Sequence, residues 1–244
     1  SRRRAAPAAR RQAAPRHPPP RRLMAERDGE GAPFRRAFYT APVVPPEEVE
    51  EARSRLGVQV HHDPCGDCPP PVASFEELGV LPEYALRGLR DQGITRPMPI
   101  QAQALPLVLS GKDVIGLAQT GSGKTLAFLM PAVVHMEAQR PVSRQDPTPL
   151  VLVLAPTREL AVQIAEEAEK VLWHSKEGRH RGGLYSVCLY GGGSKREQRD
   201  KMRQGGQVLV ATPGRLLDFL DSGFVSLRRV TYFVLDEADR MLDL

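Results

Sequence analysis

Short apolar runs alternate with longer amphipathic stretches along the chain from Phe75 onward. The short runs are typical of buried strands, which we predict at Val114–Ala118, Leu150–Ala155, Tyr185–Tyr190, Val208–Ala211 and Tyr232–Leu235. The longer stretches have apolar residues at helical spacing and predict helices at Pro82–Gln92, Pro97–Leu109, Gly123–Gln139, Thr157–Trp173, Ser194–Gln204 and Pro213–Ser222. Strands that alternate with helices indicate βαβ units, so we expect an α/β fold with a parallel sheet flanked by helices.

The first 72 residues lack this alternation. Thirteen of the chain's 23 prolines fall within residues 1–71, where no strand or helix period is sustained. A segment of this composition cannot bury enough apolar surface to become ordered. We therefore predict a mostly disordered, Arg/Pro-rich N-terminal extension over residues 1–72 and a folded domain over residues 73–244.

The net charge of +5 is distributed unevenly between these two parts. Residues 1–36 hold eleven arginines and three acidic residues, a balance of +8, which leaves −3 for residues 37–244. The predicted domain is therefore not a globally basic nucleic-acid-binding protein. Any contact with nucleic acid there would depend on local arginines and backbone amides.

The stretch Ser1–Arg22 contains no acidic residue and is open to several interpretations. Its arginines suit an RNA-binding arm, a nuclear localisation signal or an organelle transit peptide, although transit peptides are rich in serine and this stretch holds only Ser1. A solvated low-complexity tail is the simpler alternative. We expect a nuclear or cytoplasmic location, with organelle import left open. Since the chain does not begin with methionine, either translation starts upstream or Met24 is the initiator.

Three cysteines, at positions 65, 68 and 188, are too few for a disulfide framework and fit a reducing compartment. Cys65 and Cys68 form a Cys-x-x-Cys pair behind His61 and His62, and these four side chains could chelate Zn²⁺. Because no second spaced pair follows downstream, a reactive dithiol or a plain linker is the favoured interpretation. No apolar run in the sequence is long enough to span a membrane.

A glycine-rich segment joins the first predicted strand to a predicted helix, an arrangement that directs backbone amides toward one concavity and is typical of polyphosphate-binding loops. Two glycines allow positive φ and close approach of a ligand. Lys124 would reach the β- and γ-phosphates, and Thr125 would place its hydroxyl on Mg²⁺. An ordinary tight turn is the alternative, because Ala118 stands where the general pattern has its first glycine. The candidate nucleotide-binding residues of the loop are Thr120, Gly121, Ser122, Gly123, Lys124 and Thr125.

A second candidate site element, which is acidic, follows the last predicted strand. Asp236 and Glu237 lie at the carboxyl end of this strand, at the sheet edge expected for the glycine loop. Asp236 could hold Mg²⁺ through water, and Glu237 could orient and deprotonate an attacking water. The alternative is a helix N-terminus that simply favours acidic residues. The helix expected there has no C-terminal cap before Leu244, so we expect the domain to continue further.

These two motifs resemble those of the DEAD-box ATP-dependent RNA helicases. Ala118–Thr125 has the form of that family's phosphate loop, and Asp236–Asp239 spells Asp-Glu-Ala-Asp. Further segments resemble the family's Q motif, motif Ia, GG turn and motif Ib, in the expected order at Gly93–Gln101, Pro156–Leu160, Gly192-Gly193 and Thr212–Arg215. The resemblance covers about residues 73–244. It implies the N-terminal RecA-like lobe of a phosphate-loop NTPase, with a layout most similar to the p68-like branch.

The resemblance also implies roles for individual residues. Lys124, Asp236 and Glu237 would be catalytic, with ATP and Mg²⁺ as cofactors. Gln101 would select adenine, because its amide can donate to and accept from the base at once; a polar helix residue facing solvent is the alternative. Ile94 stands where the family usually has an aromatic residue that stacks on the base.

A further set of residues is implied to bind the backbone of single-stranded RNA without reading its sequence. They follow predicted strands, where amides, hydroxyls and guanidinium groups can meet phosphates. For Arg158, a salt bridge at the helix start is the alternative. The basic residues of Ser194–Gln204 are interpreted first as a solvated helix face. The implied RNA-binding residues are Pro156, Thr157, Arg158, Gly192, Gly193, Thr212, Pro213, Gly214 and Arg215.

The expected function is that of the first lobe of an ATP-dependent RNA helicase, which couples ATP hydrolysis to RNA strand separation or remodelling. A second RecA-like lobe is expected as a partner in the full-length chain, and its arginines would complete the phosphate site. We therefore expect this chain alone to hydrolyse ATP very poorly. One alternative is an ATP-gated RNA clamp or assembly scaffold with little unwinding. Another is a GTPase, but the chain has no Asn-Lys-x-Asp guanine-reading motif.

Overall fold

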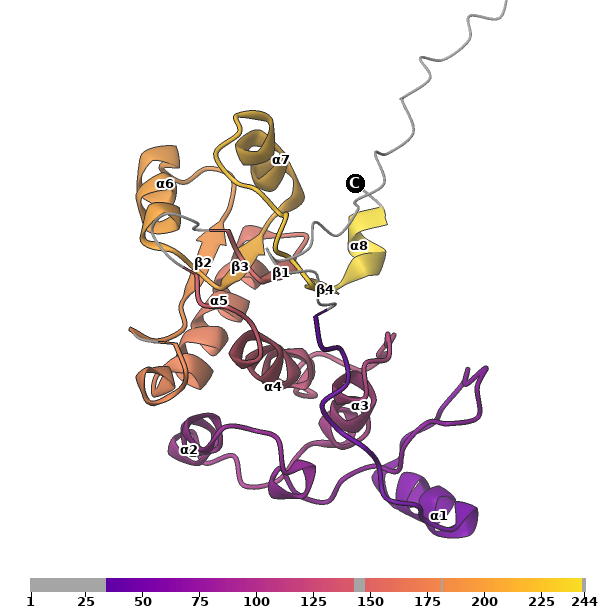
Figure 1. Ribbon diagram of the computed structural model, residues 1–244. Helices are drawn as coiled ribbons and strands as arrows, with labels where there is room; N and C mark the ends of the chain where they lie inside the picture. Colours follow the sequence, from indigo (N-terminus) through magenta and orange to yellow (C-terminus); the bar gives the residue numbers. More distant parts are fainter. Residues whose placement is uncertain (1–33, 143–147, 181, 243–244) are drawn as a thin grey trace, which may run out of the picture. The chain divides into compact units, whose positions relative to one another are not determined.

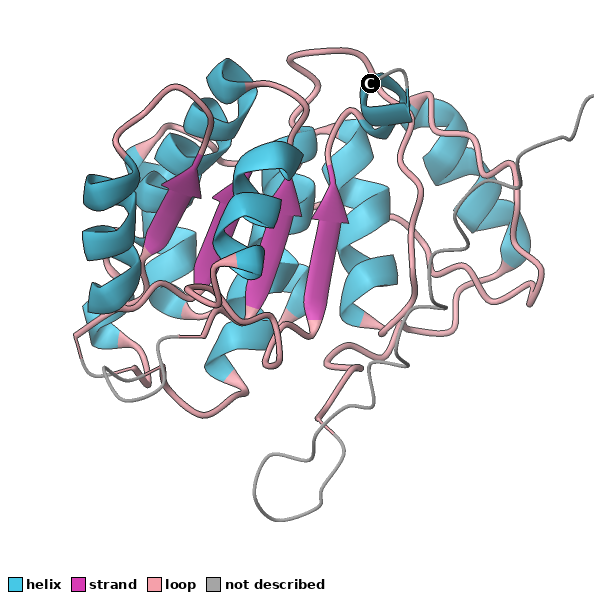
Figure 2. Ribbon diagram, turned by 90° about the horizontal axis from the view of Figure 1, so that it is seen from above, coloured by secondary structure: helices cyan, strands magenta, loops and turns pink. Residues whose placement is uncertain are grey.

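The structure is a computed structural model that describes residues 34–142, 148–180 and 182–242. Within these residues, four parallel strands form one sheet in the order β2-β3-β1-β4 (Figure 2). Each strand lies within a predicted one, so the expected parallel α/β fold is confirmed. The strands are β1 (Val151–Leu154), β2 (Ser186–Leu189), β3 (Val208–Ala211) and β4 (Tyr232–Leu235).

The described helices surround this sheet, and none of them is long and apolar enough to cross a membrane. Six coincide with predicted helices to within two residues at each end. Side-chain caps mark two of their starts, since Thr157 accepts a hydrogen bond from the amide of Leu160 and Ser194 accepts one from Glu197. The helices are α1 (Pro46–Leu56), α2 (Glu83–Asp91), α3 (Pro99–Leu109), α4 (Lys124–Glu137), α5 (Arg158–Leu172), α6 (Lys195–Gln204), α7 (Pro213–Asp221) and α8 (Ala238–Leu242), with short 3-10 turns η1 (Glu76–Leu78) and η2 (Ser175–Glu177).

Helices cover both faces of the sheet (Figure 1). Val151 and Val153 of β1 point to one face and join a core cluster with α4 and α5, which α2 and α3 extend on the outside. Leu152, between them, points to the other face and packs with residues of α6 and α7. This alternation follows the two-residue period of a strand, and burial on both faces is typical of parallel sheets.

The predicted strand Val114–Ala118 is wrong. Residues 112–119 have no regular secondary structure, and Ile115 and Leu117 are 93% and 83% exposed. β4 is the edge of the described sheet, and its Phe233 is 56% exposed. An apolar run becomes a strand only when a neighbour completes its hydrogen bonds, and no described segment pairs with this one.

Part of the predicted N-terminal extension is folded. Residues 34–72 include helix α1 and contact the domain. The amide of Phe38 donates to the carbonyl of Leu109 at 2.7 Å, and Arg53 of α1 donates to the side chain of Gln103 in α3 at 3.1 Å. The expectation of disorder is therefore corrected for this segment, because long-range hydrogen bonds and the packing of Phe38, Tyr39 and Val72 on the core hold it where the local apolar pattern is weak. The rest of the predicted extension lies outside the described residues.

Candidate functional site

The loops that follow the four strands leave the sheet from one edge. Leu154 of β1 pairs with Ala211 of β3 and Leu235 of β4, and Leu189 of β2 also pairs with Ala211, so the strands end level with one another. This edge is where open parallel sheets bind their ligands. Motif residues follow the four strand ends at positions 156–158, 192–193, 212–215 and 236–237.

The glycine loop turns tightly into the start of α4. Gly121 and Gly123 have φ angles of 78° and 86°, in the left-handed region that favours glycine. A Cβ on Gly123 would lie 2.3 Å from Nε2 of Gln101, whereas a Cβ on Gly121 would meet nothing within 4 Å. Position 123 therefore needs glycine for close packing as well as for conformation.

Lys124, the first residue of α4, lies close to the acidic end of β4. Its ammonium lowers the pKa of the Asp236 carboxyl, although burial is the larger influence and leaves the pKa of Asp236 raised. Nζ of Lys124 also donates to the carbonyl of Ala118 at 2.6 Å. The structure thus brings together a lysine and an acid that are 112 positions apart in the sequence.

Glu237 has a strained backbone. Its φ of 50° lies in the left-handed region, which costs a residue other than glycine about 1–2 kcal/mol. Its amide donates to Oδ1 of Asp236 at 3.1 Å, and its carboxylate accepts from Arg240 at 2.9 Å. Strain of this kind persists only where neighbouring contacts enforce it and often marks functional sites.

The side chains of the loop fit a bound triphosphate and its metal ion. Oγ of Ser122 is buried and has no hydrogen-bond partner among the described residues, although buried hydroxyls are normally paired. Thr125 is half-buried in the first turn of α4, and Thr120 is exposed at the turn of the loop. These hydroxyls, together with the ammonium of Lys124 and the carboxylate of Asp236, supply both donors for phosphate and oxygen ligands for Mg²⁺.

Gln101 lies beneath the glycine loop and is only 1% exposed. Its Nε2 donates to the carbonyl of Gly123 at 2.9 Å, and its Oε1 accepts from the amide of Met98 at 3.0 Å. The side chain therefore does not face solvent, and it fastens the start of α3 to the loop. Ile94 packs against the hydrophobic core rather than standing free.

Arg158 begins α5 and is exposed. Its guanidinium stacks on the ring of Tyr190 at 4.6 Å from the ring centroid, which connects the turn after β1 to the turn after β2. No described acidic side chain forms an ion pair with Arg158. The glycine turn that contains Gly192 is also exposed at this edge.

Arg215 is placed differently from Arg158. It is 8% exposed, and its guanidinium donates to the carbonyl of Gly193 at 3.3 Å and to Oε1 of Gln198 at 3.2 Å. The side chain points under the glycine turn instead of outward. The other predicted residues lie at the exposed or half-buried starts of α5 and α7, namely Pro156, Thr157, Thr212, Pro213 and Gly214.

Two polar residues at this edge were not identified from the sequence, Tyr190 and Gln198. Gln198 lies in the basic stretch that suggested a solvated face, yet it is 5% exposed. Met202 is also buried, one helical turn later. Gln198 and Met202 are uncharged and lie four residues apart, a spacing that places them on one side of α6. This pattern could have indicated from the sequence that this side of the helix is buried.

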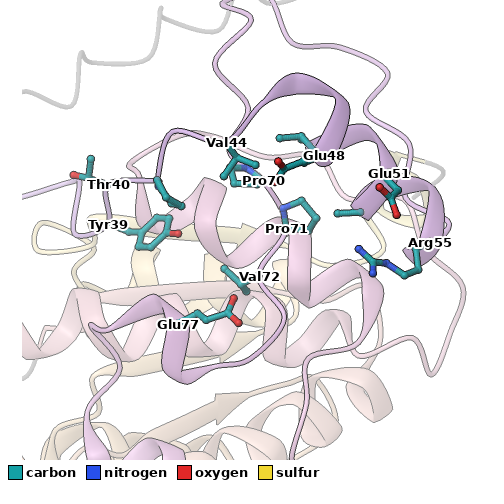
Figure 3. Close-up of a pocket in the computed structure, with 13 residues that line it drawn as sticks. Tyr39, Thr40, Val44, Glu48, Glu51, Arg55, Pro70, Pro71, Val72 and Glu77 are labelled. Carbon is teal, nitrogen blue, oxygen red and sulfur yellow. The ribbon is translucent and has the colours of Figure 1, made fainter.

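Two features lie apart from these residues. A hollow of about 830 Å³ opens between α1, residues 39–44 and residues 70–72, and none of the candidate site residues lines it (Figure 3). Cys65 is exposed, and Sγ of Cys68 lies 3.5 Å from Nε2 of Gln103. In the described part of the chain, no three or more His, Cys, Asp or Glu side chains are grouped so that they could hold a metal ion, at these cysteines or elsewhere.

Residues 98–244 match the DEAD/DEAH box helicase family, over more than half of the chain. The chain belongs to this family. It is 48% identical over 222 residues to the DEAD-box ATP-dependent RNA helicase 20 of Oryza sativa and 50% identical over 200 residues to the human "Probable ATP-dependent RNA helicase DDX17". These alignments cover 89% and 82% of this chain but 42% and 26% of the relatives. The chain therefore spans less than half of each of these DEAD-box proteins.

Solved structures support the same family and the RecA-like fold. The yeast splicing factor Prp28 matches with a TM-score of 0.74 and 34% identity, over 82% of this chain and 45% of its own. Prp28 from Chaetomium thermophilum, solved bound to ADP, matches with a TM-score of 0.71 and 35% identity, over 85% of this chain and 48% of its own. The fold of this DEAD-box chain is thus that of one half of these structures.

Proposed function

We propose that this chain is the N-terminal ATP-binding lobe of an RNA helicase, which binds ATP·Mg²⁺ and the backbone of single-stranded RNA along the carboxyl edge of its sheet. In the whole protein, a second RecA-like lobe would complete the site and couple ATP hydrolysis to RNA strand separation or remodelling. The observation that carries the proposal is that the strands end level with one another, so that Asp236, whose pKa the ammonium of Lys124 lowers, and the exposed Arg158 follow strand ends at the same edge. Family membership supports it.

Residues of the glycine loop and the start of α4, together with Asp236 after β4, would bind ATP·Mg²⁺. Lys124 would exchange its hydrogen bond with Ala118 for one to the β- and γ-phosphates, and Ser122 would find the partner it lacks. Thr125 and Asp236 would hold Mg²⁺, which neutralises the phosphate oxygens when it is bound. Because the pKa of Asp236 is raised by burial, its ionised form, and with it metal affinity, would increase as the pH rises through that pKa.

Glu237 is proposed as the residue that orients the attacking water and accepts its proton. Its strained backbone and its hydrogen bond to Arg240 limit where the carboxylate can point. A positioned general base contributes about 10²–10⁴-fold to a reaction of this kind. Removing its basicity should therefore impair hydrolysis and leave nucleotide binding intact.

Gln101 is proposed to select adenine while it holds the loop. Each of its amide atoms makes one hydrogen bond within the protein, which leaves one N–H and one oxygen lone pair. Because the side chain is only 1% exposed, a base would reach these two groups only when the glycine loop moves. These two groups match the N7 acceptor and the N6 amino donor of adenine, whereas guanine presents two acceptors at its N7 and O6. The same contact would connect base recognition to the conformation of Gly123.

For RNA, the proposed contacts come from exposed amides, hydroxyls and Arg158. Such groups bind phosphates and do not distinguish bases. The net charge of −3 over residues 37–244 makes local placement of cationic side chains necessary. We therefore expect similar affinities for single strands of different sequence.

Two equilibrium measurements on the chain test this proposal. Unlabelled ATP should displace a fluorescent ATP analogue in the presence of Mg²⁺, whereas GTP should do so at least about tenfold less well. Labelled oligouridine and oligocytidine should bind with affinities within about threefold of each other. If GTP displaced the analogue at the same concentrations as ATP, the proposed preference for ATP would be contradicted. If the chain bound neither oligonucleotide, the proposed RNA binding would be contradicted.

A further inference from the structure

A buried hydrogen-bonded cluster lies under the glycine turn that follows β2. At its centre is Gln198, whose Oε1 accepts from the amide of Tyr190 at 3.3 Å and from Arg215 at 3.2 Å. Nε2 of Gln198 donates to the carbonyl of Tyr190 at 3.1 Å. Arg215 also donates to the carbonyl of Gly193 at 3.3 Å. The amide of Gln198 thus binds both the N–H and the carbonyl of Tyr190, which precedes the glycine turn. It also binds Arg215, which in turn binds the carbonyl of Gly193 at the end of the turn.

The turn itself is shaped by this cluster. A Cβ on Gly193 would lie 2.8 Å from Nε2 of Gln198 and 2.8 Å from the Tyr190 ring, so the backbone packs directly on the two side chains. Gly192 has a φ of 78° and is exposed, as is Gly191. The exposed glycines therefore project from a base that Gln198 and Arg215 make rigid.

The cluster also reaches the neighbouring motif. The ring of Tyr190, whose backbone Gln198 holds, is the surface on which Arg158 stacks. Arg158 and the glycine turn are the groups proposed to meet RNA phosphates, and the cluster contacts both of them, through the Tyr190 ring and through the carbonyl of Gly193. Loss of the Gln198 amide would leave the amide and carbonyl of Tyr190 without these partners and would remove one of the two hydrogen bonds of Arg215, which favours a rearrangement of the turn.

We propose that Gln198 is a positioning residue for RNA binding, an inference that depends on the proposed function. It holds the turn at Gly191–Gly193 and the Tyr190 ring so that the turn's amides and the Arg158 guanidinium face one stretch of RNA backbone. Arg215 acts with it from beneath the turn rather than by touching phosphate. Neither residue takes part in nucleotide binding.

The test measures RNA and ATP affinity separately in the chain carrying Gln198→Met, which keeps the side-chain volume but removes the amide. The matched control is Gln204→Met, the same change at an exposed position of the same helix. We expect the Kd for labelled oligouridine to rise about tenfold for Gln198→Met and to stay within about twofold for the control. The Kd for a fluorescent ATP analogue should stay within about twofold for both variants.

A double-mutant cycle distinguishes positioning from a general loss of structure. Arg158→Ala should raise the RNA Kd about tenfold in the wild-type background and less than about threefold with Gln198→Met, because Arg158 is already misplaced there. If Arg158→Ala raised the RNA Kd by the same factor in both backgrounds, or if Gln198→Met left the RNA Kd unchanged, the inference would be overturned and the proposed function would stand. A wild-type chain that binds no RNA would overturn both.

A measurement on the wild-type chain does not depend on any variant folding. Hydrogen–deuterium exchange at the amides of residues 191–193 should slow when oligouridine is added with a non-hydrolysable ATP analogue. Unchanged exchange at these amides, with RNA bound, would contradict the inference because the turn would then not be where RNA binds.

Discussion

Individual residues divide the proposed ATP chemistry between binding and hydrolysis. Lys124 is the first residue of α4, directly after the glycine loop, and its ammonium lowers the pKa of Asp236. Glu237 follows Asp236 in the chain and has a strained backbone. A cation in the loop serves the phosphates in every step, but a base at position 237 is needed only when water attacks. Different consequences are therefore expected when each is replaced.

Replacement of Lys124 by alanine should weaken Mg·ATP binding by about tenfold or more, because a hydrogen bond to a charged phosphate contributes about 1.5–3 kcal/mol. Replacement of Glu237 by glutamine should leave the affinity within about threefold and lower single-turnover hydrolysis by about 10²–10⁴-fold. Titration with a fluorescent ATP analogue and a single-turnover assay measure the two effects. Equal losses of affinity in both variants would refute this division of roles.

The two loop glycines allow a prediction about packing against Gln101. Gly123→Ala places a Cβ 2.3 Å from Nε2 of Gln101, whereas Gly121→Ala meets nothing, and both positions have a positive φ. Both variants should suffer the conformational cost, and Gly123→Ala should lose about 1–3 kcal/mol more in the free energy of unfolding. Urea denaturation of the matched pair measures the difference; similar losses would argue against a tight contact between the loop and Gln101.

At the scale of the element, the contact between α4 and β4 contains a buried histidine. His135 is 6% exposed and makes a 2.6 Å hydrogen bond between its Nε2 and Oγ1 of Thr231. Its ring also packs against Phe34, Phe38 and Tyr232. Burial lowers the pKa of His135 to about 4, so the residue is neutral in the folded chain at neutral pH.

This lowered pKa predicts a loss of stability in mild acid. Below its ordinary pKa of about 6.5, His135 binds a proton in the unfolded chain but not in the folded one, so stability falls as the pH drops from about 6.5 toward 4. Between pH 7 and pH 5, the wild type should lose about 2 kcal/mol more than His135→Phe. Urea denaturation at both pH values measures this difference. An identical pH dependence in the two proteins would rule out His135 as the cause.

The unpaired segment before the glycine loop gives a second prediction at this scale. No described backbone hydrogen bond is donated by residues 114–118, whereas β1 is paired on both sides. Amides of 114–118 should therefore exchange with deuterium much faster than those of β1 in the free chain. Comparable protection of the two segments would show that 114–118 forms a strand after all.

For the whole molecule, the pattern of apolar residues was enough to predict six helices, four strands and their parallel arrangement. It failed at Val114–Ala118, because a strand depends on a neighbour as well as on its own residues. It also missed α1, which buries no residue and is held through Arg53 instead. The motif residues at 156–158, 192–193, 212–215 and 236–237 were predicted to follow strands, and they follow the level ends of β1 to β4. The spacing within α6 could have indicated the burial of Gln198, whereas the inward direction of Arg215 depends on tertiary contacts that no local pattern contains.

The proposed arrangement requires Lys124 and Asp236 to act on one nucleotide, and a double-mutant cycle on Mg·ATP affinity tests this most directly. Kd values are compared for the wild type, Lys124→Ala, Asp236→Asn and the double variant. If both side chains serve the same triphosphate and its Mg²⁺, the effects should be non-additive by about 0.5–3 kcal/mol. Additive effects would contradict the proposed arrangement, because they would mean that the two residues contribute to binding independently.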